Sequence, residues 1–321
     1  MALGSQAGNP NQGQSAIAIG RLAGASLQGN NGIAIGQQCG QLTQGTYGIA
    51  IGFACGQQAQ SNNAIAIGNS AGQNYQKSQS IAIGYLAGNN TQGTQAISIG
   101  TSAGTVKQSQ YGIAIGYQAG TTNQGINAVA IGKDAGQNTQ GQYVVAVGSQ
   151  TGTTNQGQYV VAIGRVAGQN SQGINSVAIG YSAGQTNQGA FGIAIGYGAG
   201  QTNQHANSII LNASGTSLNS STSSSFYAKP IRNEYNVKVL LYNETDGEIT
   251  CYDHNFENLK WERIDLIPDV NKYIRPTTRV DAYRRDDEER FIVRCSNANT
   301  NGAYDPSSVF TRKRFNDLYD T

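Results

Sequence analysis

A glycine recurs at every sixteenth residue of this chain from Gly4 to Gly196, without interruption. A second glycine lies four residues after each of them, from Gly8 to Gly200, and a glutamine recurs with the same period from Gln12 to Gln204. A fixed period of this length is typical of a solenoid, in which one short unit stacks on copies of itself. The period therefore restricts the first two thirds of the chain to a repetitive rod.

One repeat has the pattern of a strand followed by a turn. Ile17 and Ile19 alternate with Ala16 and Ala18, which is the period of two of a β-strand. Sixteen residues with two glycine corners allow two short strands and two turns, which make one coil of a parallel β-roll. A helix is disfavoured, since each interior glycine would cost it about 1 kcal/mol. Coils that stack about 4.8 Å apart would make residues 4–212 a rod about 60 Å long.

Residues one period apart should form columns along the rod. We expect both isoleucines of each coil to face the interior, so that one buried column runs from Ile17 to Ile209 and a second from Ile19 to Ile195. We expect the recurrent glutamines to form a third column, because in-register amides can hydrogen-bond along such a ladder. The ladder comprises Gln12, Gln28, Gln44, Gln60, Gln76, Gln92, Gln108, Gln124, Gln140, Gln156, Gln172, Gln188 and Gln204.

The residue between the two isoleucines stays small and uncharged in nearly every coil. If the isoleucines face inward, this row faces outward, where a solvated surface would tolerate a lysine or glutamate somewhere. A smooth alanine stripe permits another backbone to approach closely, so the row is a candidate subunit interface. Its alanines are Ala18, Ala34, Ala50, Ala66, Ala82, Ala114, Ala130, Ala146, Ala162, Ala178 and Ala194.

Composition changes sharply after the repeats. The chain has 321 residues and 43 glycines, yet Asp134 is the single acidic residue before residue 211. This break predicts three segments: a β-roll over 1–212, a serine-rich linker over 213–225 and a small β-rich domain over 226–321 that serves as base, trimerisation or attachment unit. In that domain the charged run 284–290 is either a solvated turn or a docking site for a capsid protein. The net charge of +2 is too small to predict nucleic-acid binding.

The sequence shows no secretory signal peptide and no apolar run long enough to cross a bilayer as a helix. Cys39 and Cys55 occupy a position that other repeats fill with alanine, so they should stack in neighbouring coils. They are either two buried thiols or a bridged pair, and the spacing of coils admits both.

The repeats lack the residues of familiar catalytic or metal centres. Only two histidines occur in the chain, no ligand set has metal-site spacing, and no cofactor motif is present. We therefore expect neither catalysis nor a cofactor. An alternative is a polysaccharide-processing enzyme on a β-helix, which would need two carboxylates that the repeats cannot supply. Binding to ice would need threonine rows more regular than those present.

Surface recognition remains, and aromatic residues are its candidates. They recur at two repeat positions, one just after the first glycine and one just before the apolar strand. Such rings could stack on sugars, or they could simply stabilise the sheet across coils. The candidate binding residues are Tyr85, Tyr111, Tyr117, Tyr143, Tyr159, Tyr181, Phe191 and Tyr197.

The segment Asn175-Ser176-Val177-Ala178-Ile179-Gly180, with Ala183 and Gly184 after it, resembles the head repeats of trimeric autotransporter adhesins. The resemblance covers roughly residues 1–211 and implies a left-handed parallel β-roll, a homotrimer and an adhesive or display role. The chain departs from that bacterial family in lacking a coiled-coil stalk and a membrane barrel.

Residues 225–233, 239–243 and 247–250 resemble the region C-terminal to similar repeats in fibre-like proteins of large DNA viruses. This resemblance implies a structural fibre on a virion surface, assembled in the host cytoplasm, with a capsid protein at its base and a host glycan or receptor as its target. A bacterial-type adhesin on a cell surface is the alternative. Neither nucleic-acid binding nor membrane insertion is expected.

Overall fold

The computed structural model describes residues 1–231 and, beyond them, 238–243, 245, 247–253, 261–264, 278–285, 290–297 and 311–314. These residues form strands, turns and loops and contain no helix. The chain divides into two units, Met1–Ile231 and Arg232–Thr321. The predicted all-β class is confirmed.

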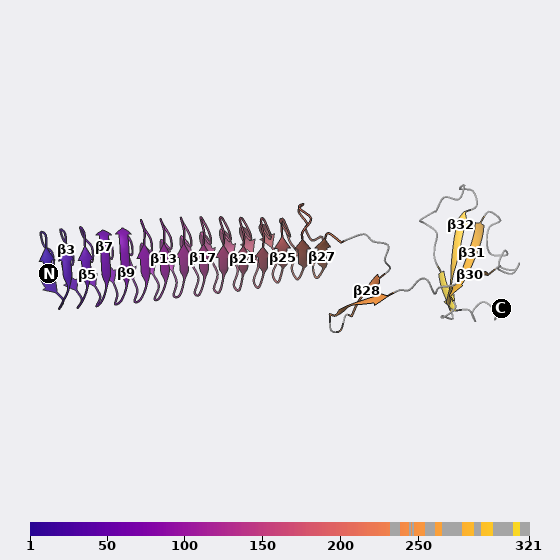
Figure 1. Ribbon diagram of the computed structural model, residues 1–321, viewed down its shortest axis with the longest axis horizontal. Helices are drawn as coiled ribbons and strands as arrows, with labels where there is room; N and C mark the ends of the chain where they lie inside the picture. The colour runs from indigo at the N-terminus through magenta and orange to yellow at the C-terminus, as the bar shows by residue number, and fades with distance from the viewer. Residues whose placement is uncertain are drawn as a thin grey trace. The chain divides into compact units, whose positions relative to one another are not determined.

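The first unit is a parallel β-solenoid built from two sheets (Figure 1). The 15-stranded sheet contains β1 (Ala2–Leu3), β3 (Ile17–Ile19), β5 (Ile33–Ile35), β7 (Ile49–Phe53), β9 (Ile65–Asn69), β11 (Ile81–Ile83), β13 (Ile97–Ile99), β15 (Ile113–Ile115), β17 (Val129–Ile131), β19 (Val145–Val147), β21 (Val161–Ile163), β23 (Val177–Ile179), β25 (Ile193–Gly196), β26 (Ile209–Asn212) and β27 (Phe226–Lys229).

The 12-stranded sheet contains the second strand of twelve successive coils. Its members are β2 (Asn11–Gln12), β4 (Leu27–Gln28), β6 (Thr43–Gln44), β8 (Ala59–Gln60), β10 (Asn74–Gln76), β12 (Asn90–Gln92), β14 (Val106–Gln108), β16 (Thr122–Gln124), β18 (Asn138–Gln140), β20 (Thr154–Gln156), β22 (Asn170–Gln172) and β24 (Thr186–Gln188).

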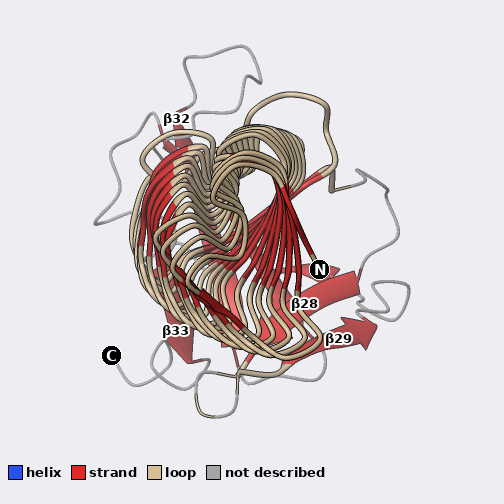
Figure 2. Cartoon of the chain, turned by 90° about the vertical axis from the view of Figure 1, so that its left-hand side faces the viewer, coloured by secondary structure: helices blue, strands red, loops and turns tan. Residues whose placement is uncertain are grey.

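Register along the solenoid matches the sequence period. In the larger sheet Ile81 pairs with Ile97 and Ser98 with Ala114, and in the smaller sheet Gln28 pairs with Gln44. Viewed along the stack, the coils superpose and their strands fall into two rows (Figure 2). The stacked sixteen-residue coils expected from the sequence are therefore confirmed.

Left-handed backbone conformations turn each coil. Gly116 has a φ of 129°, and a Cβ added to it would lie 2.5 Å from the carbonyl oxygen of Gly132 in the next coil. Residues with side chains also adopt positive φ at repeating positions, as Gln118 and Tyr111 do at 52° and 59°. The first glycine of each repeat is thus required both by its conformation and by the close approach of the next coil.

The alanine row lies inside the coil, and the isoleucines lie outside it. Ala18, Ala114 and their counterparts in the other coils are fully buried within the single chain. Ile17 and Ile19 are only half-buried. Two sheets joined by sixteen-residue coils enclose a narrow interior, which accepts alanine and one glutamine per coil but not two isoleucines.

Two expectations are therefore wrong. The isoleucine columns are not the core, and the alanines cannot form the predicted subunit interface, because all of them are buried by their own chain. The eleven buried alanines are Ala18, Ala34, Ala50, Ala66, Ala82, Ala114, Ala130, Ala146, Ala162, Ala178 and Ala194.

The solenoid extends past the predicted boundary at residue 212. β27 pairs in parallel with β26, from Ile209 opposite Phe226 to Asn212 opposite Lys229. The connecting residues are held by the preceding coil, since the Leu218 amide donates to the Gly198 carbonyl at 3.0 Å and the Gly200 amide donates to the Leu218 carbonyl at 2.7 Å. Residues 213–225 are thus a loop of the last coil rather than a free linker.

Tyr227 fastens that loop. Its phenol oxygen accepts from the Ser221 amide at 2.9 Å and from the Thr222 amide at 3.3 Å. The Ser221 hydroxyl lies 3.0 Å away, and these hydrogen bonds, together with those from Ser225 and Thr222, lower the pKa of Tyr227 to about 7.

The second unit contains antiparallel strands. β28 (Lys238–Tyr242) pairs with β29 (Ile249–Asp253), as expected for a hairpin around Gly247. A four-stranded sheet has the order β30 (Trp261–Ile264), β31 (Thr278–Arg285), β32 (Arg290–Asn297) and β33 (Thr311–Arg314). Residues 286–289, the acidic centre of the candidate docking run, lie outside the described residues.

Candidate binding face

The outer surface of the larger sheet is apolar along its whole length. We call it the isoleucine face; it consists of the row that starts at Ile17 and the row that starts at Ile19. Every sixteenth residue from Ile17 to Ile209 is isoleucine or valine, and so is every sixteenth residue from Ile19 to Ile195. Exposed fractions reach 37% at Ile131, 39% at Ile163 and 38% at Ile195. The isoleucine and valine side chains of this face therefore contact solvent in the single chain.

Two further rows flank the isoleucine face. The entry row lies two residues before the first isoleucine and includes Tyr111 and Tyr143, whereas the exit row lies two residues after the second and includes Tyr85 and Tyr117. All eight candidate binding rings belong to these rows and are exposed. Their exposed fractions are 52% for Tyr85, 45% for Tyr111, 50% for Tyr117, 48% for Tyr143, 54% for Tyr159, 43% for Tyr181, 52% for Phe191 and 48% for Tyr197.

Half of these rings stack on one another. Tyr143 and Tyr159 have centroids 5.2 Å apart and an interplanar angle of 4°, and Tyr181 and Tyr197 have centroids 5.3 Å apart and an angle of 9°. The Arg165 guanidinium lies 5.5 Å from the Tyr181 centroid. Ring faces in these pairs are turned along the rod axis and cover each other, which favours stabilisation across coils for these four residues.

The glutamine column lies inside the coil. Gln28 and the later members are buried, whereas Gln12 in the first coil is half-buried. Side-chain amides of successive glutamines hydrogen-bond in seven steps, which link Gln28 to Gln44, Gln44 to Gln60, Gln60 to Gln76, Gln76 to Gln92, Gln108 to Gln124, Gln172 to Gln188 and Gln188 to Gln204. Each glutamine amide thus makes, inside a narrow coil, the hydrogen bonds that water would otherwise make.

The ladder is interrupted between Gln92 and Gln108, where the Ser98 hydroxyl donates to Gln108 Oε1 at 2.7 Å. It is interrupted again from Gln124 to Gln172, where larger residues enter the interior. Val144 and Val160 are buried at a position that other coils fill with glycine, alanine or serine. In these coils and the one after them, the Oε1 atoms of Gln140, Gln156 and Gln172 have no hydrogen-bond partner in the described part of the chain, and the same holds for Gln28 Oε1 near the start of the ladder. The continuous ladder expected from the sequence is therefore divided into segments.

The difference in hydrogen bonding predicts that replacement of a ladder glutamine by leucine lowers the free energy of unfolding by different amounts at two positions. Gln60 Nε2 donates to the carbonyls of Ile49 and Ala64 and to Gln76, and its Oε1 accepts from Gln44. We expect Gln60→Leu to lower the free energy of unfolding by about 3 kcal/mol, because it leaves several buried groups unpaired. Gln156→Leu, which removes fewer hydrogen bonds, should cost about 1 kcal/mol. Urea denaturation measures both, and equal losses would contradict a ladder that stabilises the coil.

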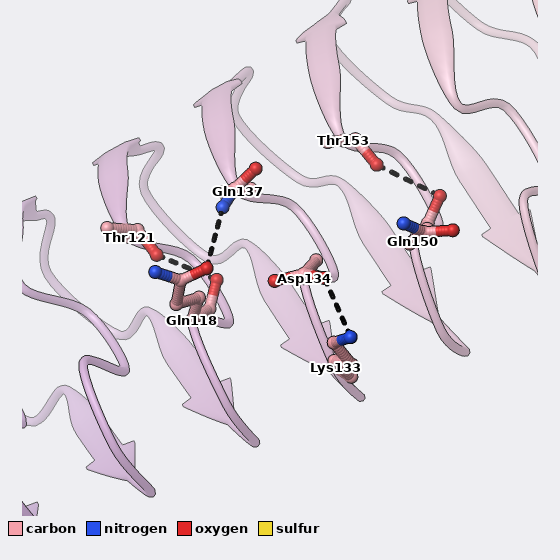
Figure 3. Close-up of polar contacts among 7 residues, drawn as sticks. All are labelled: Gln118, Thr121, Lys133, Asp134, Gln137, Gln150 and Thr153. Carbon is pink, nitrogen blue, oxygen red and sulfur yellow. Dashed lines mark hydrogen bonds and ion pairs between the residues drawn. The ribbon is translucent and has the colours of Figure 1, made fainter.

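A second polar ladder lies on the surface and was not predicted from the sequence. Gln57 donates to Gln41 at 2.9 Å, and Gln185 donates to Gln169 at 3.1 Å. Figure 3 shows three coils of this row, in which the Thr121 hydroxyl donates to the Gln118 carbonyl at 2.7 Å and Gln137 Nε2 donates to Gln118 Oε1 at 3.2 Å. Its signal in the sequence is a Gln, Thr or Asn three residues before each interior glutamine from Gln44 onward.

Titratable groups are sparse on the described surface. The one ion pair among the described residues joins the exposed Lys133 to the half-buried Asp134 at 3.9 Å (Figure 3). No group of three His, Cys, Asp or Glu side chains that could hold a metal ion occurs in the part of the chain that the structure describes. Within those same residues no helix is long and apolar enough to cross a membrane.

Cys39 and Cys55 are buried free thiols in adjacent coils. Cys39 Sγ donates to the Gly52 carbonyl at 3.2 Å. The hydrogen bond between the two thiols lowers the pKa of Cys39 and raises that of Cys55, and burial raises the pKa of Cys55 further. In this structure the pair fills the alanine position of the interior without a bridge.

Comparison with models of known protein families, with curated proteins and with solved structures gave no match. The functional argument therefore depends on the surface of the solenoid itself.

Proposed function

We propose that this chain is a structural fibre protein, and that copies of it associate through the isoleucine face. The observation that supports this most strongly is the reversal of inside and outside in the coil. Alanine fills the interior, while two uninterrupted rows of isoleucine and valine face outward. An apolar surface of this length is rare on a monomeric protein and is typical of an interaction site.

A second copy of the same chain is the partner that fits this face best. It carries the same rows at the same coil spacing, so two faces can remain in register along the whole solenoid. The rows carry no charge that would oppose close approach. Tyrosines at the flanks agree with the composition of protein interfaces, where aromatic residues are enriched and charged residues are depleted at the centre.

In this proposal three copies surround a shared apolar axis, as the resemblance to adhesin heads implies. The rod then serves display, spacing and attachment on a virion surface, with a host glycan or receptor as its target. The second unit is the candidate base, where a capsid protein would bind.

The experiment introduces charge on the isoleucine face and measures assembly. Ile131→Lys combined with Ile163→Lys alters two exposed side chains and leaves the interior intact, so each coil should still fold. We expect the unmodified chain to have a mass near three times 33.7 kDa by light scattering and the double variant to fall to one third of that value.

The matched control places the same charges on the other sheet. Thr139→Lys combined with Asn155→Lys alters exposed residues of β18 and β20 and should leave the mass unchanged. Circular dichroism verifies that both variants keep their strands. Retention of the trimeric mass in the isoleucine variant would contradict the proposed interface.

A further inference from the structure

The interior of the solenoid contains a pair of nucleophilic side chains that the proposed fibre does not use. Cys39 and Cys55 occupy the same position in adjacent coils and are fully buried. They pack in one cluster with alanines, among them Ala23 and Ala71 at the same position of the flanking coils. Because alanine fills this position elsewhere, packing alone does not require sulfur in either coil.

The backbone holds the two cysteines at the spacing of hydrogen-bonded coils. The Gly24 amide donates to the Cys39 carbonyl at 2.9 Å, and the Gly40 amide donates to the Cys55 carbonyl at 2.9 Å. Each cysteine precedes a glycine in the left-handed conformation, with φ of 55° at Gly40 and 53° at Gly56. Residues in register on adjacent coils lie about 4.8 Å apart, and a disulfide joins Cα atoms about 4.4 to 6.8 Å apart. The spacing of the coils therefore meets the backbone requirement of a disulfide.

The sulfur of Cys39 reaches toward the coil that contains Cys55. Its Sγ donates to the carbonyl of Gly52, three residues before Cys55, at 3.2 Å. A hydrogen bond also joins the two thiols and lowers the pKa of Cys39, whereas the pKa of Cys55 is raised. Cys39 is thus the thiol that ionises first, and Cys55 lies beside it as the resolving thiol.

We infer that Cys39 and Cys55 form a redox-sensitive cross-link between two adjacent coils, with a small disulfide such as oxidised glutathione as the oxidant. Reducing conditions keep the free thiols of the structure, and oxidising conditions convert them to the cross-link. The inference does not depend on the isoleucine face, because both sulfurs are buried by their own chain.

The reaction is a thiol–disulfide exchange in two steps. While the coil is open, the Cys39 thiolate attacks one sulfur of oxidised glutathione, and cleavage of the S–S bond releases a glutathione thiolate. The Cys55 thiolate then attacks the Cys39 sulfur and displaces the second glutathione. The two thiol protons of the chain end on the two glutathiones, so the protein loses two electrons and the oxidant gains them.

Folding should favour the cross-link, because the closed coil already holds the two sulfurs together. In the unfolded chain the same bond has to close a loop of about sixteen residues at a cost in chain entropy. We expect the equilibrium constant for oxidation to be about a hundredfold larger in the folded chain than in the chain unfolded in concentrated urea.

The test equilibrates the full chain with defined ratios of reduced and oxidised glutathione, after refolding in buffer and, in parallel, in concentrated urea. Free thiols are then alkylated and the chain is cleaved with trypsin. Both cysteines leave in one peptide, residues 22–77, since no lysine or arginine occurs between Arg21 and Lys77. In the cross-linked form this peptide carries no alkyl group and is lighter by two hydrogen atoms. Cys251 and Cys295 lie in other peptides and do not enter the measurement.

The matched control moves one sulfur a further coil away. Cys55→Ala combined with Ala71→Cys keeps two cysteines at the same repeat position but separates them by two coil steps, about 9.6 Å, which a disulfide does not span. We expect this variant to be oxidised less readily when folded than in urea.

An equilibrium constant that is no larger in buffer than in urea would overturn the inference. So would a bond between two chains in place of the internal one, or a control variant that behaves like the unmodified chain. Light scattering on the same samples tests the proposed fibre independently. A trimer without favoured oxidation refutes the cross-link alone, and a monomer with favoured oxidation refutes the fibre alone.

Discussion

Ala114→Ile is expected to lower the free energy of unfolding of the solenoid by about 3 kcal/mol, because it forces three additional carbons into a coil interior without free space. Ala114 is fully buried between Ser98 and Ala130 of the neighbouring coils. Expansion would have to separate the two sheets, which would also break the glutamine hydrogen bonds between them.

The adjacent residue provides the matched comparison. Ile113→Ala removes a half-buried outward side chain and should cost about 1 kcal/mol. Both substitutions are made in the chain that carries Ile131→Lys and Ile163→Lys, so that loss of assembly does not enter the measurement. Urea unfolding monitored by circular dichroism gives the two values. A larger loss at Ile113 than at Ala114 would restore the isoleucines to the interior and refute the observed arrangement.

Gly116→Ala should have an effect of comparable size, through the backbone rather than the core. The new Cβ would lie 2.5 Å from the Gly132 carbonyl oxygen, at a φ of 129° that side chains rarely adopt. Neither the steric clash nor the unfavourable backbone conformation can be relieved without moving one coil away from the next. We expect a loss of roughly 3 kcal/mol in the free energy of unfolding, measured by the same urea titration.

Gly215→Ala separates the two contributions. Gly215 also has a positive φ, of 74°, but nothing lies within 4 Å of an added Cβ. Its substitution should cost about 1 kcal/mol, from backbone conformation alone. Equal losses at Gly116 and Gly215 would show that close stacking of the coils contributes nothing to the requirement for glycine.

The period of the sequence determined the coil correctly but did not show which side of each strand faces inward. The alternation of Ile17, Ala18 and Ile19 defines two faces of the strand. It does not indicate which face is buried, because a shift of one residue exchanges the two faces. The usual assumption places the larger side chain inside. In this narrow coil the smaller side chain lies inside and the larger one outside. Only the distance between the two sheets shows this, and the sequence does not contain that distance.

Other differences between the structure expected from the sequence and the observed structure also have local causes. Serines between residues 214 and 225 resemble a linker in composition, but β27 returns to the sheet at Phe226 and closes the loop. The aromatic positions were recognisable from the sequence. Which of these rings stack depends on which residues occupy neighbouring coils, and that depends on the register of the sheet.

The central claim is that the isoleucine face joins copies of this chain, and the mass of the unmodified chain in solution tests it most directly. Sedimentation equilibrium of the full-length protein at low micromolar concentration should give a mass near three times 33.7 kDa. A mass of 33.7 kDa under the same conditions would mean that the isoleucine rows remain exposed to solvent, and it would contradict the proposed fibre.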